Sequence, residues 1–113
     1  MKKHQRPKAT QSYTVREPTG CGNLYVTVGK DNEKVIEIFA VLGKGGSCIT
    51  THNEALTRAI SLGLKYGIPL EEYIEELSGI NCPGHVWSEG KQITSCADAI
   101  ARVLKEEVQK EAK

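Results

Sequence analysis

The sequence has no long hydrophobic run, few aromatic residues and almost no net charge, at 5% aromatic and +1. Apolar stretches such as 38–42 are far too short to cross a bilayer, and the basic N-terminus has no apolar signal core behind it. We therefore expect neither membrane insertion nor secretion, and we expect a cytoplasmic protein. No paired-carboxylate site, nucleophile elbow or Ser-His-Asp order occurs, so nothing argues for independent hydrolytic catalysis.

The size and composition that are present predict a single domain. At 113 residues, 39% hydrophobic and 26% charged, the chain is ordinary for one globular unit and too short for a multidomain enzyme. Eleven Gly and four Cys stand out. A cytosolic chain keeps its thiols reduced and uses clustered cysteines for metal or redox work.

A basic, flexible arm is predicted over 1–12. It contains four cations and no acidic residue: Lys2, Lys3, Arg6 and Lys8. Such an arm is either a solvated tail or a nucleic-acid contact, and the absence of aromatic residues among the cations favours the tail.

A β-hairpin is predicted next, from 24–28 and 35–42, because both stretches are rich in apolar and β-branched residues. The residues between them, 29–34, include Gly, Asp and Asn and suit a turn. A short third strand is expected at 13–15, ended quickly by 16–18.

Three helices are predicted after the hairpin. A capping box at Thr51 and Glu54 predicts the start of the first, whose apolar residues cover so much of its circumference that we expect burial on more than one side. Gly67 ends that helix, and Pro69 opens the second, which ends at Gly79.

The remaining chain completes an α+β domain over 13–108, a small antiparallel hairpin or sheet followed by three helices. Residues 84–92 are predicted to be irregular or to form a small hairpin around 88–90, and Ser95 is expected to cap the last helix. The final turns from Lys105 are charged throughout, and residues 109–113 are expected to fray.

The four cysteines each lie beside small residues or at a helix start, where free backbone amides favour a thiolate. They are Cys21, Cys48, Cys82 and Cys96. Four thiolates could form a closed, structural Cys₄ zinc shell. Successive cysteines are 27, 34 and 14 positions apart, however, so no CxxC pair supports zinc by spacing.

Two other interpretations of the cysteines stay open. Free cysteines are often small buried hydrophobes, and two of them could form a redox dithiol. His85, three positions after Cys82, is a spare metal ligand, whereas His52 is first a residue of the predicted capping turn.

A glycine-rich stretch between the hairpin and the first helix could contact a phosphate or nucleotide through backbone amides and an ammonium. The residues concerned are Lys44, Gly45, Gly46 and Ser47. The stretch lacks the order of a P-loop, and the simpler interpretation is a flexible connection that delivers Cys48.

Five stretches resemble, in order, the motifs of the TSCPD domain family. The most characteristic is TSCAD at 94–98, in which Ala97 replaces the proline of the family name, a change that the first turn of a helix tolerates. The others are GCGNLYVTV at 20–28, LGKGGSC at 42–48, EALTRAISL at 54–62 and LSGINCP at 77–83. The resemblance covers roughly 6–108.

The resemblance implies a place beside a large enzyme. This domain is known as the C-terminal part of vitamin B12-dependent (class II) ribonucleotide reductases, and as a free-standing protein with four cysteines suspected of binding metal. All four cysteines here fall on family motifs. The resemblance therefore implies a zinc-binding accessory domain of a ribonucleoside-diphosphate reductase, linked to deoxyribonucleotide synthesis, with the reductase's catalytic chain as partner.

Catalysis by this chain alone is not expected. Ribonucleotide reduction needs a cobalamin-generated radical inside a large barrel that 113 residues cannot hold, so cobalamin is expected only through the partner. The alternatives are a thiol-disulfide relay for a reductase and a free-standing zinc module that binds nucleotide or nucleic acid. Self-association stays open.

Overall fold

Three long strands form one antiparallel sheet. The computed structural model describes residues 2–43 and 48–111. In it β1 (Gln11–Thr19), β2 (Gly22–Asp31) and β3 (Lys34–Leu42) pair in the order β1-β2-β3, which confirms the predicted hairpin. The strand expected at 13–15 was predicted too short, because Arg16 and Pro18 also pair with β2. β1 is an edge strand, where proline is tolerated.

The turn between β2 and β3 consists of Asn32 and Glu33. Both residues adopt left-handed backbone angles, with φ of 51° and 67°. A two-residue turn of this kind matches the right-handed twist of the flanking strands and fixes their register at Asp31 opposite Lys34.

Three helices and a small hairpin complete an α+β fold. They are α1 (Cys48–Lys65), α2 (Leu70–Leu77), the pair β4 (Val86–Ser88) and β5 (Lys91–Ile93), and α3 (Cys96–Glu111). Gly67 and Gly79 lie just after α1 and α2, as predicted for the ends of these helices, and both have a positive φ, at 94° and 77°. The predicted capping box is wrong, because α1 begins at Cys48 and Thr51 lies inside the helix.

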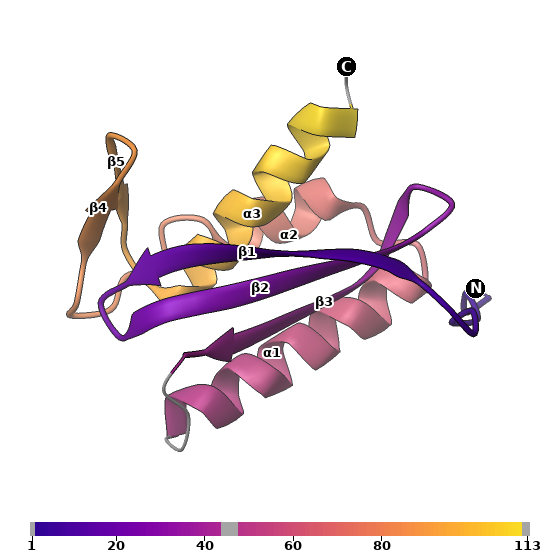
Figure 1. Ribbon diagram of the computed structural model, residues 1–113, viewed down its shortest axis with the longest axis horizontal. Coiled ribbons are helices and arrows are strands. Elements are labelled where there is room, and N and C mark those ends of the chain that lie inside the picture. Colours follow the sequence, from indigo (N-terminus) through magenta and orange to yellow (C-terminus); the bar gives the residue numbers. More distant parts are fainter. Residues whose placement is uncertain (1, 44–47, 112–113) are drawn as a thin grey trace.

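One face of α1 packs against the edge of β3, and the expected burial on several sides is wrong. Figure 1 shows α1 lying along β3, while Leu62 on its other side is 50% exposed. The buried face includes Ser61, whose Oγ donates to the carbonyl of Ile38 and accepts from its N–H, both at 2.9 Å. A side chain thus satisfies backbone groups that an edge strand would otherwise leave open.

The core lies between the inner face of the sheet and the helices. Alternate residues of β2 and β3 are fully or almost fully buried there, together with aliphatic residues of the helices: Leu24, Val26, Val28, Ile38, Ala40, Leu42, Ile60, Leu64, Ile100 and Leu104. None of these is aromatic. No helix within the described ranges is long and apolar enough to span a bilayer.

The charged end of α3 contains a buried ion pair. Glu107 is fully buried; it accepts a hydrogen bond from Tyr13 of β1, and its carboxylate lies 2.6 Å from the ammonium of Lys30 on β2. Burial alone would raise the pKa of Glu107, but Lys30 and Tyr13 outweigh it, and the pKa is lowered. α3 is helical to Glu111, and fraying over 109–113 stays a prediction.

Lys30→Ala should lower the free energy of unfolding by about 3 kcal/mol, because it leaves the Glu107 carboxylate buried without its countercharge. Urea unfolding measures the change. Lys105→Ala, which removes an exposed lysine of α3, is the control and should change stability by less than about 0.5 kcal/mol. Equal effects of the two substitutions would show that the pair does not hold α3 to the sheet.

A candidate thiol site at one end of the sheet

The turn between β1 and β2 holds Cys21 through Thr19. The Thr19 hydroxyl donates to the carbonyl of Gly22 at 2.7 Å and accepts from the backbone N–H of Cys21 at 3.1 Å. The thiol of Cys96, at the first position of α3, lies 3.9 Å from the same hydroxyl oxygen. One buried threonine therefore links the Cys21 turn to the start of α3.

Hydrogen bonds of the TSCAD segment, residues 94–98, hold the loop that contains Cys82 against the start of α3. Ser95 caps the helix as predicted, its Oγ accepting from the N–H of Asp98 at 3.0 Å. The Asp98 carboxylate accepts from the N–H groups of Thr94 at 3.1 Å and Gly79 at 2.8 Å. The N–H of Cys82 donates to the carbonyl of Thr94 at 2.8 Å. The motif thereby places Cys82 beside the start of α3.

A close backbone contact joins the two loops that carry Cys21 and Cys82. A Cβ atom added to Gly20 would lie 2.2 Å from the carbonyl oxygen of Gly84, so no larger residue fits without moving one loop. The same carbonyl accepts from the Cys82 thiol at 3.3 Å. Gly20 and Gly84 are needed because backbone meets backbone here.

Cys82 and Cys96 both lie near enough to Cys21 to influence its ionisation. Burial raises the pKa of Cys21, and the negative charges that Cys96 and Cys82 would carry as thiolates raise it further. The expected thiolate-favouring environment is therefore not found at Cys21. Within the described ranges, no three His, Cys, Asp or Glu side chains are arranged as a metal shell.

Cys48, the first residue of α1, lies at the same end of the sheet as the other three cysteines. It is exposed at the start of α1, and Figure 1 shows this start, the β1–β2 turn and the start of α3 at one end of the sheet. The N–H of Gly43 donates to the carbonyl of Asn23 at 3.0 Å, which ties the end of β3 to the Cys21 turn. Gly43, Cys21 and Tyr25 line a hollow of about 570 Å³.

Other residues singled out from the sequence lie elsewhere. His85 is exposed and shares a 2.9 Å hydrogen bond with Gln92, and His52 is exposed within α1. Arg6 pairs with Glu37, while Lys2, Lys3 and Lys8 are exposed. The predicted phosphate loop, Lys44 to Ser47, lies outside the described residues.

Sequence reasoning missed the residues that bring the thiols together. Thr19, Asp98 and the Gly20 to Gly84 contact were not predicted as parts of the site. The one available signal was the small residues beside the cysteines, in Gly20-Cys21-Gly22 and Cys82-Pro83-Gly84. Which glycines meet depends on tertiary packing and could not be obtained from local sequence.

The chain belongs to the TSCPD domain family, whose model matches residues 1–108. The sequence resemblance is therefore confirmed. The cysteine cluster described above is formed by segments that carry the family's motifs.

Among curated proteins, the chain is similar to short parts of vitamin B12-dependent ribonucleotide reductases. It is 37% identical over 70 residues to the one from Agrobacterium fabrum, covering 61% of this chain and 6% of that protein. Identity is 31% over 74 residues for Bradyrhizobium diazoefficiens, covering 65% and 6%, and 33% over 76 residues for Streptantibioticus cattleyicolor, covering 66% and 12%. The chain thus spans 6 to 12% of these relatives. No solved structure gives a significant match.

In the metal-free protein, Cys96→Ser should lower the pKa of Cys21 towards the ordinary thiol value, because it removes one of the neighbouring negative charges. The pH dependence of Cys21 alkylation, followed by mass spectrometry in the presence of a chelator, measures this pKa. Cys48→Ser is the control. A Cys21 profile unchanged by both Cys96→Ser and Cys82→Ser would contradict the thiol cluster.

The raised pKa of Cys21 also predicts how the stability of the metal-free protein changes with pH. The folded chain keeps the Cys21 proton to a higher pH than the unfolded chain, so the free energy of unfolding of the metal-free protein should fall as the pH rises past the ordinary thiol pKa. This loss should be smaller in Cys96→Ser.

Proposed function

We propose that the chain is a zinc-binding accessory domain of a vitamin B12-dependent ribonucleotide reductase, with Cys21, Cys48, Cys82 and Cys96 as ligands. The observation that carries the proposal is the convergence of three cysteines from distant parts of the chain at the Gly20 to Gly84 contact. Distant segments meeting through their thiols are what a structural metal holds together.

The residues present fit a zinc ion by their chemistry. The Cys21 thiol, whose ionisation the neighbouring Cys82 and Cys96 oppose, would be stabilised as a thiolate by a divalent cation, which deprotonates a coordinating thiol outright. Cys48 would supply the fourth ligand, since its helix begins at the same end of the sheet. The described residues do not form a finished metal shell, so completing one would require the cysteine segments, the start of α1 included, to draw together when the metal binds.

The role of this site would be structural. Zinc supplies a closed, redox-inactive link between ligands. The chain's own residues already prepare the link: Thr19 positions the Cys21 turn, and Asp98 holds the Cys82 loop against α3. Ligation by Cys48 would add the first turn of α1 to this group, so that every layer of the fold is fastened at one end.

The reductase connection rests on the relatives, in which the matching segment is a small part of a far longer chain. A domain of this size adds a surface to such an enzyme and leaves the radical chemistry, with its cobalamin, to the catalytic chain. We propose that this catalytic chain is the partner, and that the pair serves deoxyribonucleotide synthesis.

Purified protein should contain about one zinc per chain by elemental analysis. Cys82→Ser should lose the metal together with cooperative unfolding, because metal binding of this kind contributes on the order of 10 kcal/mol to folding. Gly20→Ala keeps all four thiols but forces the two loops apart, and it should weaken zinc binding markedly.

His85→Ala is the matched control for these variants, since His85 is exposed and bonded to Gln92, and it should keep the metal. Wild-type protein with no metal, in which all four thiols react rapidly with a thiol reagent, would contradict the zinc proposal.

A second function is favoured by the same thiol proximity. As a relay, Cys21 with Cys82 or Cys96 would give two electrons and two protons to a disulfide of the partner and become a disulfide, which a thioredoxin-type dithiol then reduces. This use needs two free thiols and competes directly with zinc.

Mild oxidation of metal-free protein should form one intramolecular disulfide between Cys21 and Cys82 or Cys96, located by peptide mass spectrometry and reversed by thioredoxin. Cys48→Ser should leave its formation unchanged. If the metal-free protein forms no such disulfide, and protein purified with zinc keeps the metal under the same oxidant, the relay is wrong and the structural metal is supported. Disulfides formed only between chains would contradict it as well.

A further inference from the structure

Two surface hollows follow the exposed side of α1 and share Lys65. One, of about 390 Å³, is lined by cations of the N-terminal arm, the start of β3 and the end of α1, with an aromatic ring: Lys2, Lys3, Lys34, Lys65 and Tyr66. The other, of about 480 Å³, is lined by Phe39, Arg58, Leu62 and Lys65. We call these residues together the basic track.

The track contains no carboxylate. Neither hollow is lined by Asp or Glu among the described residues. The acid nearest to Lys65 is Glu37, at 3.9 Å, and Arg6 already engages both of its carboxylate oxygens at 2.8 and 3.1 Å. Arg6 thus neutralises the acid behind the track, to which Lys65 also lies within ion-pair distance. The exposed cations of the track are left for an external anion: Lys2, Lys3, Lys34 and Arg58.

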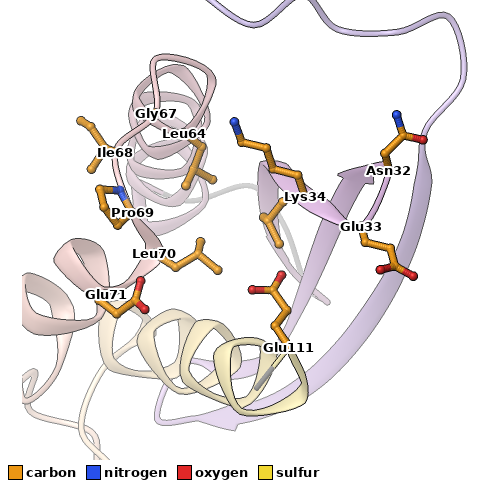
Figure 2. A pocket seen from close by; sticks show the side chains of 11 residues that line it. Asn32, Glu33, Lys34, Leu64, Gly67, Ile68, Pro69, Leu70, Glu71 and Glu111 are labelled. Atoms are coloured by element: carbon orange, nitrogen blue, oxygen red, sulfur yellow. The ribbon is translucent and has the colours of Figure 1, made fainter. Parts of the chain in front are cut away.

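The N-terminal arm is held in the position that builds the track. The backbone N–H of His4 donates to the carbonyl of Lys65 at 2.7 Å. The Nε2 atom of the His4 ring lies 2.8 Å from the Asp31 carboxylate. These contacts place Lys2 and Lys3 beside the end of α1. Figure 2 shows the Lys34 side chain directed towards that same end, where Gly67 lies.

Aromatic residues of this chain are mostly on its surface. The sequence has one Trp, one Phe and four Tyr, and four of these six are exposed, including Phe39 at 42% and Tyr66 at 37%. Rings left in water at a cost are typical of recognition surfaces. The arm has no aromatic residue among its cations in sequence. Folding brings Tyr66 beside the arm's lysines, and it brings Phe39 beside Arg58 and Lys65.

We propose that the basic track binds single-stranded nucleic acid. Phosphates would lie along the cations, and unpaired bases would stack on Tyr66 and Phe39. An acidic peptide would use the cations but not the rings, and a duplex keeps its bases stacked inside. Exposed rings beside exposed cations therefore favour a single strand. The track offers stacking rather than base-edge contacts, so binding is expected to be largely independent of sequence.

Acidic residues beside the track limit where the strand can run. On the other side of the β2–β3 turn, a hollow of about 520 Å³ is lined by Lys34 with Glu33, Glu71 and Glu111 (Figure 2). These carboxylates repel phosphate and confine a strand to the α1 side of Lys34.

Fluorescence anisotropy of a labelled oligothymidylate of about 12 nucleotides, titrated with the purified full chain at low salt, tests the proposal. We expect binding that weakens steeply as salt rises. Tyr66→Ala and Phe39→Ala should each weaken it at least about five-fold. Arg58→Ala combined with Lys34→Ala should make the slope of log affinity against log salt about 1.4 units less steep.

Matched controls separate the track from general basicity. Lys91→Ala combined with Lys105→Ala removes the same charge from elsewhere, and Trp87→Ala removes a more exposed ring, at 71% exposure; all should bind like wild type. Circular dichroism confirms that each variant is folded. Absent binding at low salt, equal losses in track and control variants, or equal affinity for duplex DNA, polyglutamate or anionic vesicles would each overturn the proposal.

Discussion

The contact between Gly20 and Gly84 is the constraint on which the candidate site depends. With a predicted approach of 2.2 Å for any added Cβ, it is a place where two backbones meet with no space for a side chain. The contact fixes the Cys21 turn against the Cys82 loop, and Thr19 and Asp98 then fix both to the start of α3. Cys82 and Cys96 lie near Cys21 because these contacts position the backbones that carry them.

The far end of the sheet is held by a different interaction. Glu107 joins α3 to Tyr13 and Lys30 on the two strands beneath it, and its ionised form is favoured by those partners against the cost of burial. Removing one partner of a buried pair is strongly destabilising, because the other charge is then buried without compensation. The domain therefore has a thiol cluster at the start of α3 and an ion pair near its end, and the two interactions fix the helix along its length.

Local sequence predicted the elements well and the packing poorly. Left-handed glycines, the Ser95 cap and the β2–β3 hairpin follow from short-range chemistry, and all were found. The course of β1 past Pro18 depends on pairing with β2, and the single buried face of α1 depends on the edge of β3, so neither could be read from spacing. The cysteines were identifiable as a group by family motifs, but their convergence results from Gly20 and its partner loop.

The basic track could not be predicted from the amino-acid composition, because the net charge averages over surfaces of opposite sign. A net charge of +1 averages carboxylates on one side of Lys34 with lysines and arginine on the other, and only folding separates them. α1 connects the two surfaces: Cys48 begins it and Lys65 ends it, 18 residues that span about 27 Å. Arg58, the cation of the proposed track that lies nearest to Cys48 along α1, is ten residues or about 15 Å from it. The same rigid helix carries both, so fixing its first turn through Cys48 would also steady the lysine at its last.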